Sequence, residues 1–240
     1  MIMANSPLVV YTNLSPNNSG RRTHKIDRIT PHCVVGQCTA EGLGSWFANT
    51  ASQSSANYGI DRDGRVGLYV DEGNRSWCSS SRENDQRAVT IECASDATAP
   101  YAFRDVVYQK LIELCTDICQ RNGKRKLLWL GSKEETLAYE PAEDEMVLTV
   151  HRWFAAKDCP GEWLYNRLGK LAKTVTGNLA DGGEDINAPT MPVGKPDLAV
   201  RVLQTCMAND GYWPEGQIDG LKSPEFRAKI QEYAHDVANC

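Results

Sequence analysis

A histidine and a cysteine lie eight positions apart in the second half of the chain, in a pattern that could hold a metal ion. His151 and Cys159 belong to the string His-Arg-Trp-Phe-Ala-Ala-Lys-Asp-Cys-Pro-Gly, which ends at Gly161. Both side chains reach one metal if the chain between them folds back. Pro160 suits the first position of a helix, which predicts Cys159 at the N-cap, where the helix dipole and free N–H groups stabilise a thiolate. A thiolate is the form of cysteine that binds zinc, and Lys157 adds a positive charge nearby.

A second histidine, His32, lies in an apolar strand candidate at residues 29–35 and is the third candidate ligand. His24 lies in a basic, polar stretch and His235 in a predicted C-terminal helix, so we expect both to be solvated. Two histidines and one cysteine leave the fourth position of a tetrahedral zinc ion open, as in a catalytic site. For each of these residues taken alone, a structural role is commoner than metal binding. Their spacing does not decide between the two roles.

Composition and charge restrict the class of protein. The 240 residues are 41% hydrophobic and 24% charged, as in an ordinary globular protein. A net charge of −5 argues against a nucleic-acid partner, because phosphate binding needs clustered positive charge. No run approaches the roughly 20 apolar residues of a membrane-spanning helix, and the N-terminus lacks the features of a secretory signal. We therefore expect synthesis in the cytoplasm and no membrane insertion. The nine cysteines form no dense disulfide framework, so most are expected to be small buried hydrophobes.

Strands and helices are predicted to alternate from about residue 20 to 172. Asp63-Gly64 is a two-residue turn signal in the middle of a hairpin predicted at residues 58–70. The other predicted strands are 29–35, 88–93 and 146–150, and the predicted helices are 41–52, 101–122 and one that begins at Pro160. Gly, Asp, Asn, Pro and Thr dominate residues 175–196, which is linker composition. Two short helices are predicted after it, at 197–209 and 223–237.

Four stretches, in the same order, resemble the type 2 N-acetylmuramoyl-L-alanine amidases, the family shared by phage lytic amidases and peptidoglycan recognition proteins. They are the strand ending in His32-Cys33, the segment 55–64 (SANYGIDRDG), the strand 89–92 (VTIE), and the segment 151–161. The resemblance implies an α/β fold with a central mixed β-sheet flanked by helices. It also implies a Zn²⁺ ion held by His32, His151 and Cys159, and hydrolysis of the amide between N-acetylmuramic acid and L-alanine in bacterial peptidoglycan.

The resemblance also suggests roles for three further residues. Glu92 matches the family's strand glutamate and is the candidate base, Lys157 is the candidate for stabilising the oxyanion, and Trp77 is the candidate for the wall of the substrate groove. Without the resemblance they would be interpreted as a surface glutamate, a solvated lysine and a buried tryptophan. The chain departs from the family at Ala56, where several members carry a tyrosine, and at Cys78, where many carry a histidine.

The expected organisation is a zinc amidase domain at 1–174, a linker at 175–196 and a small helical domain at 197–240. The last piece weakly resembles the peptidoglycan-binding domain of wall hydrolases, and a helical element that forms a homodimer is the alternative. A wall enzyme without a signal segment fits a phage endolysin that acts on the cell wall after release.

Two other functions remain open. Peptidoglycan recognition proteins can keep this fold and bind without cutting, typically after losing the cysteine ligand, whereas all three candidate ligands are present here. A thiol-dependent wall hydrolase would use Cys159 or Cys33 with a histidine. Sensitivity to a chelator separates the thiol enzyme from the zinc enzyme.

Overall fold

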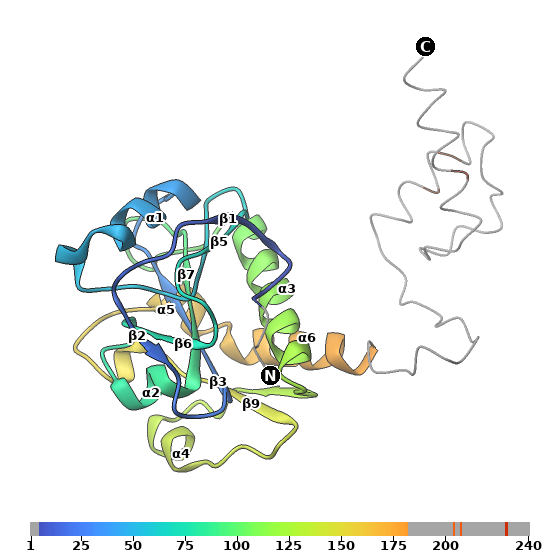
Figure 1. The fold of residues 1–240 in the computed structure, drawn as a ribbon. Coiled ribbons are helices and arrows are strands. Elements are labelled where there is room, and N and C mark those ends of the chain that lie inside the picture. The colour runs from blue at the N-terminus through green and yellow to red at the C-terminus, as the bar shows by residue number, and fades with distance from the viewer. Residues whose placement is uncertain (1–4, 182–203, 205–206, 208–228, 230–240) are drawn as a thin grey trace. The chain divides into compact units, whose positions relative to one another are not determined.

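A computed structural model describes residues 5–181 together with the single positions 204, 207 and 229. The chain divides into two units, residues 1–184 and 185–240 (Figure 1). The predicted small domain at 197–240 and most of the predicted linker lie outside the described residues. The account that follows is of the first unit.

The centre of this unit is a mixed sheet of seven strands, in the order β1-β5-β4-β7-β3-β9-β8. Only the β4–β5 pair is antiparallel within it, and the remaining neighbours are parallel. The strands of this sheet are β1 (Val9–Thr12), β3 (Arg28–Cys33), β4 (Tyr58–Ile60), β5 (Val66–Leu68), β7 (Ala88–Cys93), β8 (Lys126–Leu128) and β9 (Glu145–Leu148). A separate antiparallel pair is formed by β2 (Asn18–Arg21) and β6 (Asn74–Ser76).

Helices cover the sheet, which confirms the predicted α/β architecture (Figure 1). The α-helices are α1 (Ala40–Ala48), α2 (Arg82–Arg87), α3 (Asp105–Arg121), α4 (Lys133–Ala138), α5 (Gly161–Tyr165) and α6 (Leu168–Asp181). Two short 3-10 helices are η1 (Thr50–Ser52) and η2 (His151–Trp153). None of the helices in the described part of the chain is long and apolar enough to span a membrane.

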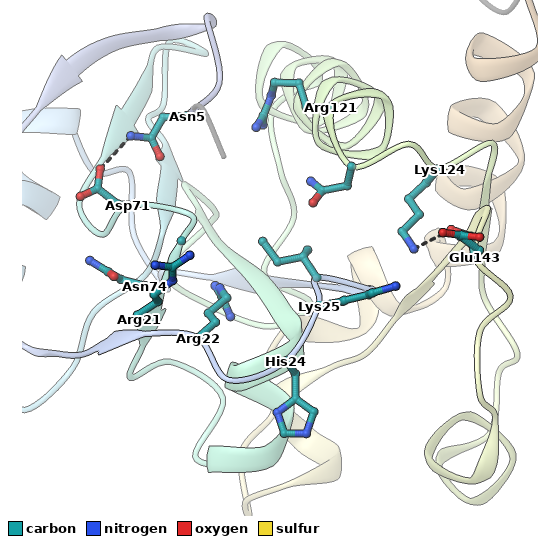
Figure 2. A pocket seen from close by; sticks show the side chains of 13 residues that line it. Asn5, Arg21, Arg22, His24, Lys25, Asp71, Asn74, Arg121, Lys124 and Glu143 are labelled. Carbon is teal, nitrogen blue, oxygen red and sulfur yellow. Dashed lines mark hydrogen bonds between the residues drawn. The ribbon is translucent and has the colours of Figure 1, made fainter. Parts of the chain in front are cut away.

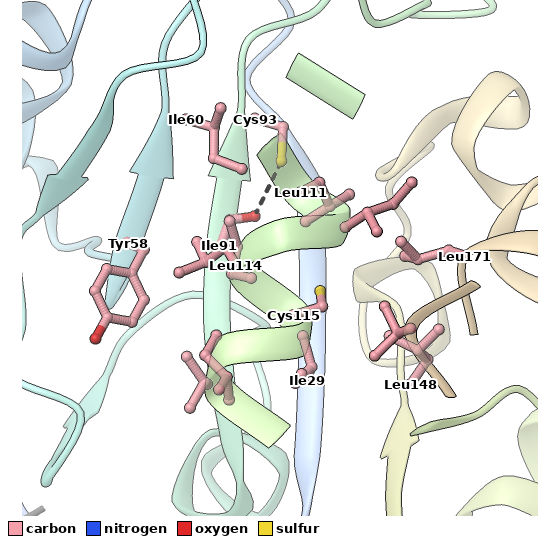
Figure 3. Packing of buried hydrophobic residues seen from close by; sticks show 14 of the residues in the cluster. Ile29, Tyr58, Ile60, Ile91, Cys93, Leu111, Leu114, Cys115, Leu148 and Leu171 are labelled. Atoms are coloured by element: carbon pink, nitrogen blue, oxygen red, sulfur yellow. Dashed lines mark hydrogen bonds between the residues drawn. The ribbon is translucent and has the colours of Figure 1, made fainter. Parts of the chain in front are cut away.

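The main core lies between the central strands and helix α3. Ile29 of β3 and Ile91 of β7 point to the same face of the sheet, because side chains alternate along a strand. Figure 3 shows them beside Leu111 and Leu114 of α3, and all four side chains are fully buried. Burying one such side chain contributes about 1.5–3 kcal/mol. The opposite face of the same strands carries polar residues and is the face that builds the site.

Helix α1 packs on the other face of the sheet, over β4 and β5. Gly59 lies between two residues of the main core and points the opposite way, toward α1. A Cβ atom at Gly59 would lie 2.8 Å from Leu43 of α1 and 2.8 Å from Tyr69. The missing side chain therefore lets α1 approach the sheet closely.

Three of the differences from the predicted element boundaries have a clear cause in the structure. Helix α3 begins at Asp105 rather than near residue 101, because Tyr101 has a left-handed backbone (φ 59°) that an α-helix does not allow. Helix α6 continues to Asp181, past the predicted start of the linker at 175, and Val175 and Leu179 extend its buried face. The hairpin has a larger loop than two residues, because β4 ends at residue 60 and β5 starts at residue 66.

Side chain and main chain of Asp61 organise this hairpin loop. Its carboxylate accepts hydrogen bonds from the backbone N–H groups of Asp63 and Arg65, each at 2.9 Å. The N–H of Gly64 donates to the Asp61 carbonyl, and Gly64 has a φ of 80° that suits glycine. Asp63-Gly64 thus lies in the loop as predicted, although Asp61 fixes its form.

Candidate active site

Three neighbouring strands bring the predicted polar residues to one edge of the sheet. His32 on β3 is paired in register with Glu92 on β7, so their side chains lie next to each other. Ile29 of β3 is paired with Leu148 of β9, and His151 follows Leu148 by three residues, as His32 follows Ile29. Because β7, β3 and β9 are adjacent and parallel, their carboxyl ends deliver all three side chains to the same place.

The three predicted metal ligands come together. One ligand atom from each of His32, His151 and Cys159 lies within 4.8 Å of the others. The Sγ atom of Cys159 is 3.3 Å from Nδ1 of His32, and the two imidazole rings have centroids 5.0 Å apart. This set of two imidazoles and one thiol is one that zinc accepts with a fourth position left open.

Burial keeps both imidazoles in the form that binds a metal. Desolvation, and then the charge of His151, lowers the pKa of the buried His32 well below its usual value. Desolvation, and then the charge of Lys157, lowers the pKa of His151. His32 is therefore neutral at pH 7, and its buried Nε2 has no hydrogen-bond partner in the described part of the protein. The neutral ring fits a residue that binds a cation, and the nitrogen that faces Cys159 and Glu92 is Nδ1.

The position of Cys159 corrects one prediction. Helix α5 starts at Gly161 with Pro160 as its N-cap, so Cys159 precedes the N-cap instead of occupying it. A hydrogen bond with Cys33, followed by burial, raises the pKa of Cys159 well above its usual value. The helix terminus does not stabilise a thiolate here, and a bound cation would have to provide that stabilisation.

Glu92 lies beside the ligand set. Its Oε1 atom is 3.9 Å from Nδ1 of His32 and 3.8 Å from Sγ of Cys78, while its buried Oε2 has no hydrogen-bond partner in the described structure. Burial raises the pKa of Glu92 to about 7, so the carboxyl group can both accept and donate a proton near neutral pH. His32, Cys78 and Glu92 also form a second set of ligand atoms within 4.8 Å, which shares His32 with the first set.

Comparison with known proteins now defines the family. The sequence profile of N-acetylmuramoyl-L-alanine amidase (Amidase_2) matches residues 22–162, more than half of the chain. The chain belongs to this amidase family. The match includes every residue of the two ligand sets.

Solved structures were also found that are similar to this chain. The Staphylococcus aureus hydrolase AmiA, solved with its ligand, is 13% identical and aligns over 77% of this chain and 90% of that chain, with a TM-score of 0.50. The endolysin N-acetylmuramoyl-L-alanine amidase LysCS from Clostridium intestinale is 14% identical over 66% of this chain and 90% of that chain, with a TM-score of 0.48. No curated protein sequence matches the chain.

A cavity of about 520 Å³ opens next to the ligands of this amidase-family site. Glu92 and His151 line it, together with the two tryptophans Trp46 and Trp77. Each indole is fixed by a hydrogen bond from its Nε1, that of Trp77 to Ser19 at 2.6 Å and that of Trp46 to Ser54 at 3.3 Å. Trp77 therefore lies on the wall of the cavity that also contains the candidate base, and its contact with a substrate stays a prediction.

Lys157, the candidate for stabilising the oxyanion, lies between the candidate ligands His151 and Cys159 in the chain. Its side chain is exposed and does not line the cavity described above. Its charge is still close enough to lower the pKa of His151. The structure thus places Lys157 in solvent, near the candidate ligand His151 and outside the cavity lining.

Ser80 and Trp46 contact the site or line its cavity and were missed in the sequence, whereas Cys33 had been named as a possible nucleophile. The hydroxyl of Ser80 is 3.0 Å from Nε2 of His151, and Ser80 has a positive φ of 62°. Cys33 contacts Cys159, and Trp46 of α1 is 61% exposed at the cavity. Of these residues, only Trp46 could have been considered from the sequence, because a tryptophan in an amphipathic helix is a candidate for binding a ligand.

His24, which we expected to be solvated, lies apart from the candidate site. His24 is exposed, and its ring contacts the Thr23 hydroxyl. Tyr58 is fully buried in the core, where its hydroxyl donates to Glu72. The predicted position of His235 lies outside the described residues.

Proposed function

We propose that this protein hydrolyses the amide between the lactyl group of N-acetylmuramic acid and L-alanine in bacterial peptidoglycan, with Zn²⁺ as its cofactor. The observation that carries the proposal is the convergence of His32, His151 and Cys159 beside Glu92, at the mouth of a cavity. Membership of the amidase family supports the bond that is cut.

The residues supply separate parts of the reaction. Zinc bound by the two histidines and the cysteine would polarise the scissile carbonyl and lower the pKa of a water molecule from about 16 to about 7. Glu92 takes the proton of the attacking water and returns it to the leaving amine of L-alanine. A carboxyl group with a pKa of about 7 suits both steps, because its two protonation states are equally populated near neutral pH.

The remaining site residues act on the substrate. Lys157 stabilises the negative charge that develops on the carbonyl oxygen, from its place beside His151. Trp77 forms one wall of the cavity and presents a flat apolar surface to the glycan or the stem peptide.

The proposed substrate is part of the bacterial cell wall, so the protein has to reach the wall to act. We propose that the protein is a phage endolysin, made in the cytoplasm and acting on the cell wall after release, and that its activity lyses the cell. Residues 197–240 would then bind the wall or join two copies of the chain.

The decisive experiment measures soluble fragments released from purified cell walls by the wild-type protein, by the protein treated with a zinc chelator, and by Cys159→Ala. Cys119→Ala is the matched control, because Cys119 is a buried thiol on α3, away from the cavity. We expect new N-terminal alanine in the wild-type and control digests, with no release in the other two. Walls that are bound but never cut would indicate a recognition protein. Cutting that persists under the chelator and fails in Cys159→Ala would indicate a thiol enzyme.

A further inference from the structure

A second cavity lies at the amino ends of the central strands, and the candidate active site lies at their carboxyl ends. It has a volume of about 780 Å³ (Figure 2). Its lining residues come from the segment 21–26 between β2 and β3, from the turn 71–74 and from 121–124 at the end of α3, together with Asn5 and Glu143. His32 lies near the end of β3 and Ile26 precedes its start. A strand of six residues spans about 20 Å, so the two sites are separate.

Basic side chains dominate the lining of this cavity, although the whole chain has a net charge of −5. Two acidic residues, Asp71 and Glu143, also line it. The basic lining residues are Arg21, Arg22, His24, Lys25, Arg121 and Lys124. In Figure 2 the charged groups surround the cavity, while the ring of His24 points away from it.

The cations differ in how fully their charge is compensated. Arg121 forms ion pairs with Glu72 and Asp117. Lys124 donates to the main-chain carbonyl of Glu143 at 2.8 Å, which is a neutral acceptor. Arg21 and Lys25 are exposed at the rim.

Arg22 is the most unusual of these groups. Its guanidinium donates to the main-chain carbonyls of Glu72 and Asp85 and to the side-chain carbonyl of Asn57, all of which are neutral oxygens. Burial lowers the pKa of Arg22 to about 10, so it remains charged at pH 7. Its charge is held in place at the wall of the cavity without a carboxylate bonded to it among the described residues.

The two acidic residues of the lining leave this positive character in place. The Asp71 carboxylate accepts a hydrogen bond of 2.7 Å from the side chain of Asn5, on the side of the cavity near the N-terminus. The main-chain carbonyl of Glu143 accepts the hydrogen bond from Lys124, which is drawn as a dashed line in Figure 2. The cations of the lining outnumber these two acids, and Arg21 and Lys25 are the exposed ones that an anion could reach, whereas Arg22 is bonded to protein oxygens.

We propose that this cavity is a binding site for a ligand with several oxyanion groups, either phosphates or carboxylates. Arginine guanidinium groups and lysine ammonium groups are the side chains that bind such anions through charge-assisted hydrogen bonds. The cavity is much larger than one phosphate, and its cations come from separate segments of the chain, so one ligand must offer at least two anionic groups. The site binds this ligand without taking part in hydrolysis.

The test is the affinity of the full chain for two fluorescein-labelled probes, measured by fluorescence anisotropy at low and moderate salt. One probe is an abasic hexamer of deoxyribose phosphates, and the other is a hexamer of glutamate. The site variant is the double substitution Arg21→Gln with Lys25→Gln. The matched control is Lys170→Gln with Lys173→Gln, which removes the same charge from exposed positions of α6.

We expect the site variant to weaken binding of at least one probe by about fivefold or more, and the control to weaken it by less than about twofold. The probe that binds more tightly identifies the anion as phosphate or carboxylate. Equal losses in both variants, or no binding of either probe, would overturn the proposal. Hydrolysis of a soluble muramoyl-peptide should be the same in the site variant as in the wild type, and a matching loss of hydrolysis would show that the two cavities are not separate.

Discussion

Replacing Glu92 by glutamine separates its proposed role as a base from a role as a metal ligand. Glutamine has nearly the same shape as glutamate and cannot take a proton from water. If Glu92 is the base, the Glu92→Gln variant should bind zinc as the wild type does and lose about 10²–10⁴-fold in kcat. That loss corresponds to about 2.7–5.4 kcal/mol of the activation free energy. The assay pairs the rate of alanine release with the zinc content of the purified protein.

The same substitution has a calculable effect on stability without metal. Glu92 has a pKa of about 7 in the folded protein and 4.5 as its ordinary value, because burial penalises the charged form. The folded state therefore holds the proton more tightly than the unfolded state, and the metal-free wild type loses stability as pH rises from about 4.5 to about 7. Each pKa unit is worth about 1.36 kcal/mol, which gives about 3 kcal/mol as an upper limit. Because the side chain is 19% exposed, we expect about 1–3 kcal/mol.

Urea unfolding in the presence of a chelator measures this difference. Near pH 4 the Glu92→Gln variant and the wild type should be equally stable, whereas at pH 8 the variant should be more stable by about 1–3 kcal/mol. Glu135→Gln, at an exposed position of α4, is the control and should show no such dependence. If the Glu92→Gln variant loses zinc together with activity, Glu92 does not act as the base alone. That result would favour Glu92 as a metal ligand in the second set, with Cys78 and His32.

Three further substitutions test how the fold supports the site. Gly161 has a φ of 82°, and a Cβ atom there would lie 2.7 Å from the carbonyl oxygen of Pro100. Gly161→Ala should therefore lower the free energy of unfolding by about 1–3 kcal/mol. It should also lower zinc affinity by about tenfold or more in a competition titration. Arg121→Met should cost about 3–5 kcal/mol in chemical denaturation, since the fully buried Glu72 loses its ion-pair partner. Leu111→Ala should cost about 2–5 kcal/mol through the cavity left in the core, with the kcat of the remaining folded protein unchanged.

Much of the fold follows from local sequence patterns. Alternating residues predicted β7 at 88–93 to within its observed bounds, and the apolar spacing of Val107, Leu111, Leu114 and Ile118 predicted the buried face of α3. The meeting of His32, His151 and Cys159 required the family resemblance, since their spacing alone left a structural role open. The structure brings the three together, and their function as zinc ligands remains a prediction.

The features that were missed depend on contacts between distant parts of the chain. The contact of Ser80 with His151 joins residues 71 positions apart, and that of Cys33 with Cys159 joins residues on β3 and on the loop before α5. Helix α6 continues beyond residue 175 because Val175 and Leu179 are buried in the core, which outweighs the local preference of Gly and Asn for a loop. No local pattern encodes these contacts, so they become visible only in three dimensions.

The site is built from parts of unequal rigidity, and this predicts where it is most sensitive to substitution. His32 and Glu92 lie on two hydrogen-bonded strands in the middle of the sheet, where the register fixes their separation. Cys159 lies on a loop that is held by a few hydrogen bonds, from the Arg152 N–H to the Cys159 carbonyl at 3.1 Å and from the Gly161 N–H to the Asp158 carbonyl at 2.7 Å. Without a cation its thiol is neutral, because Cys33 and burial raise its pKa. If Cys159 is a metal ligand as proposed, metal binding has to deprotonate it and hold its loop, so changes in this loop should alter metal affinity more than changes of similar size in the strands.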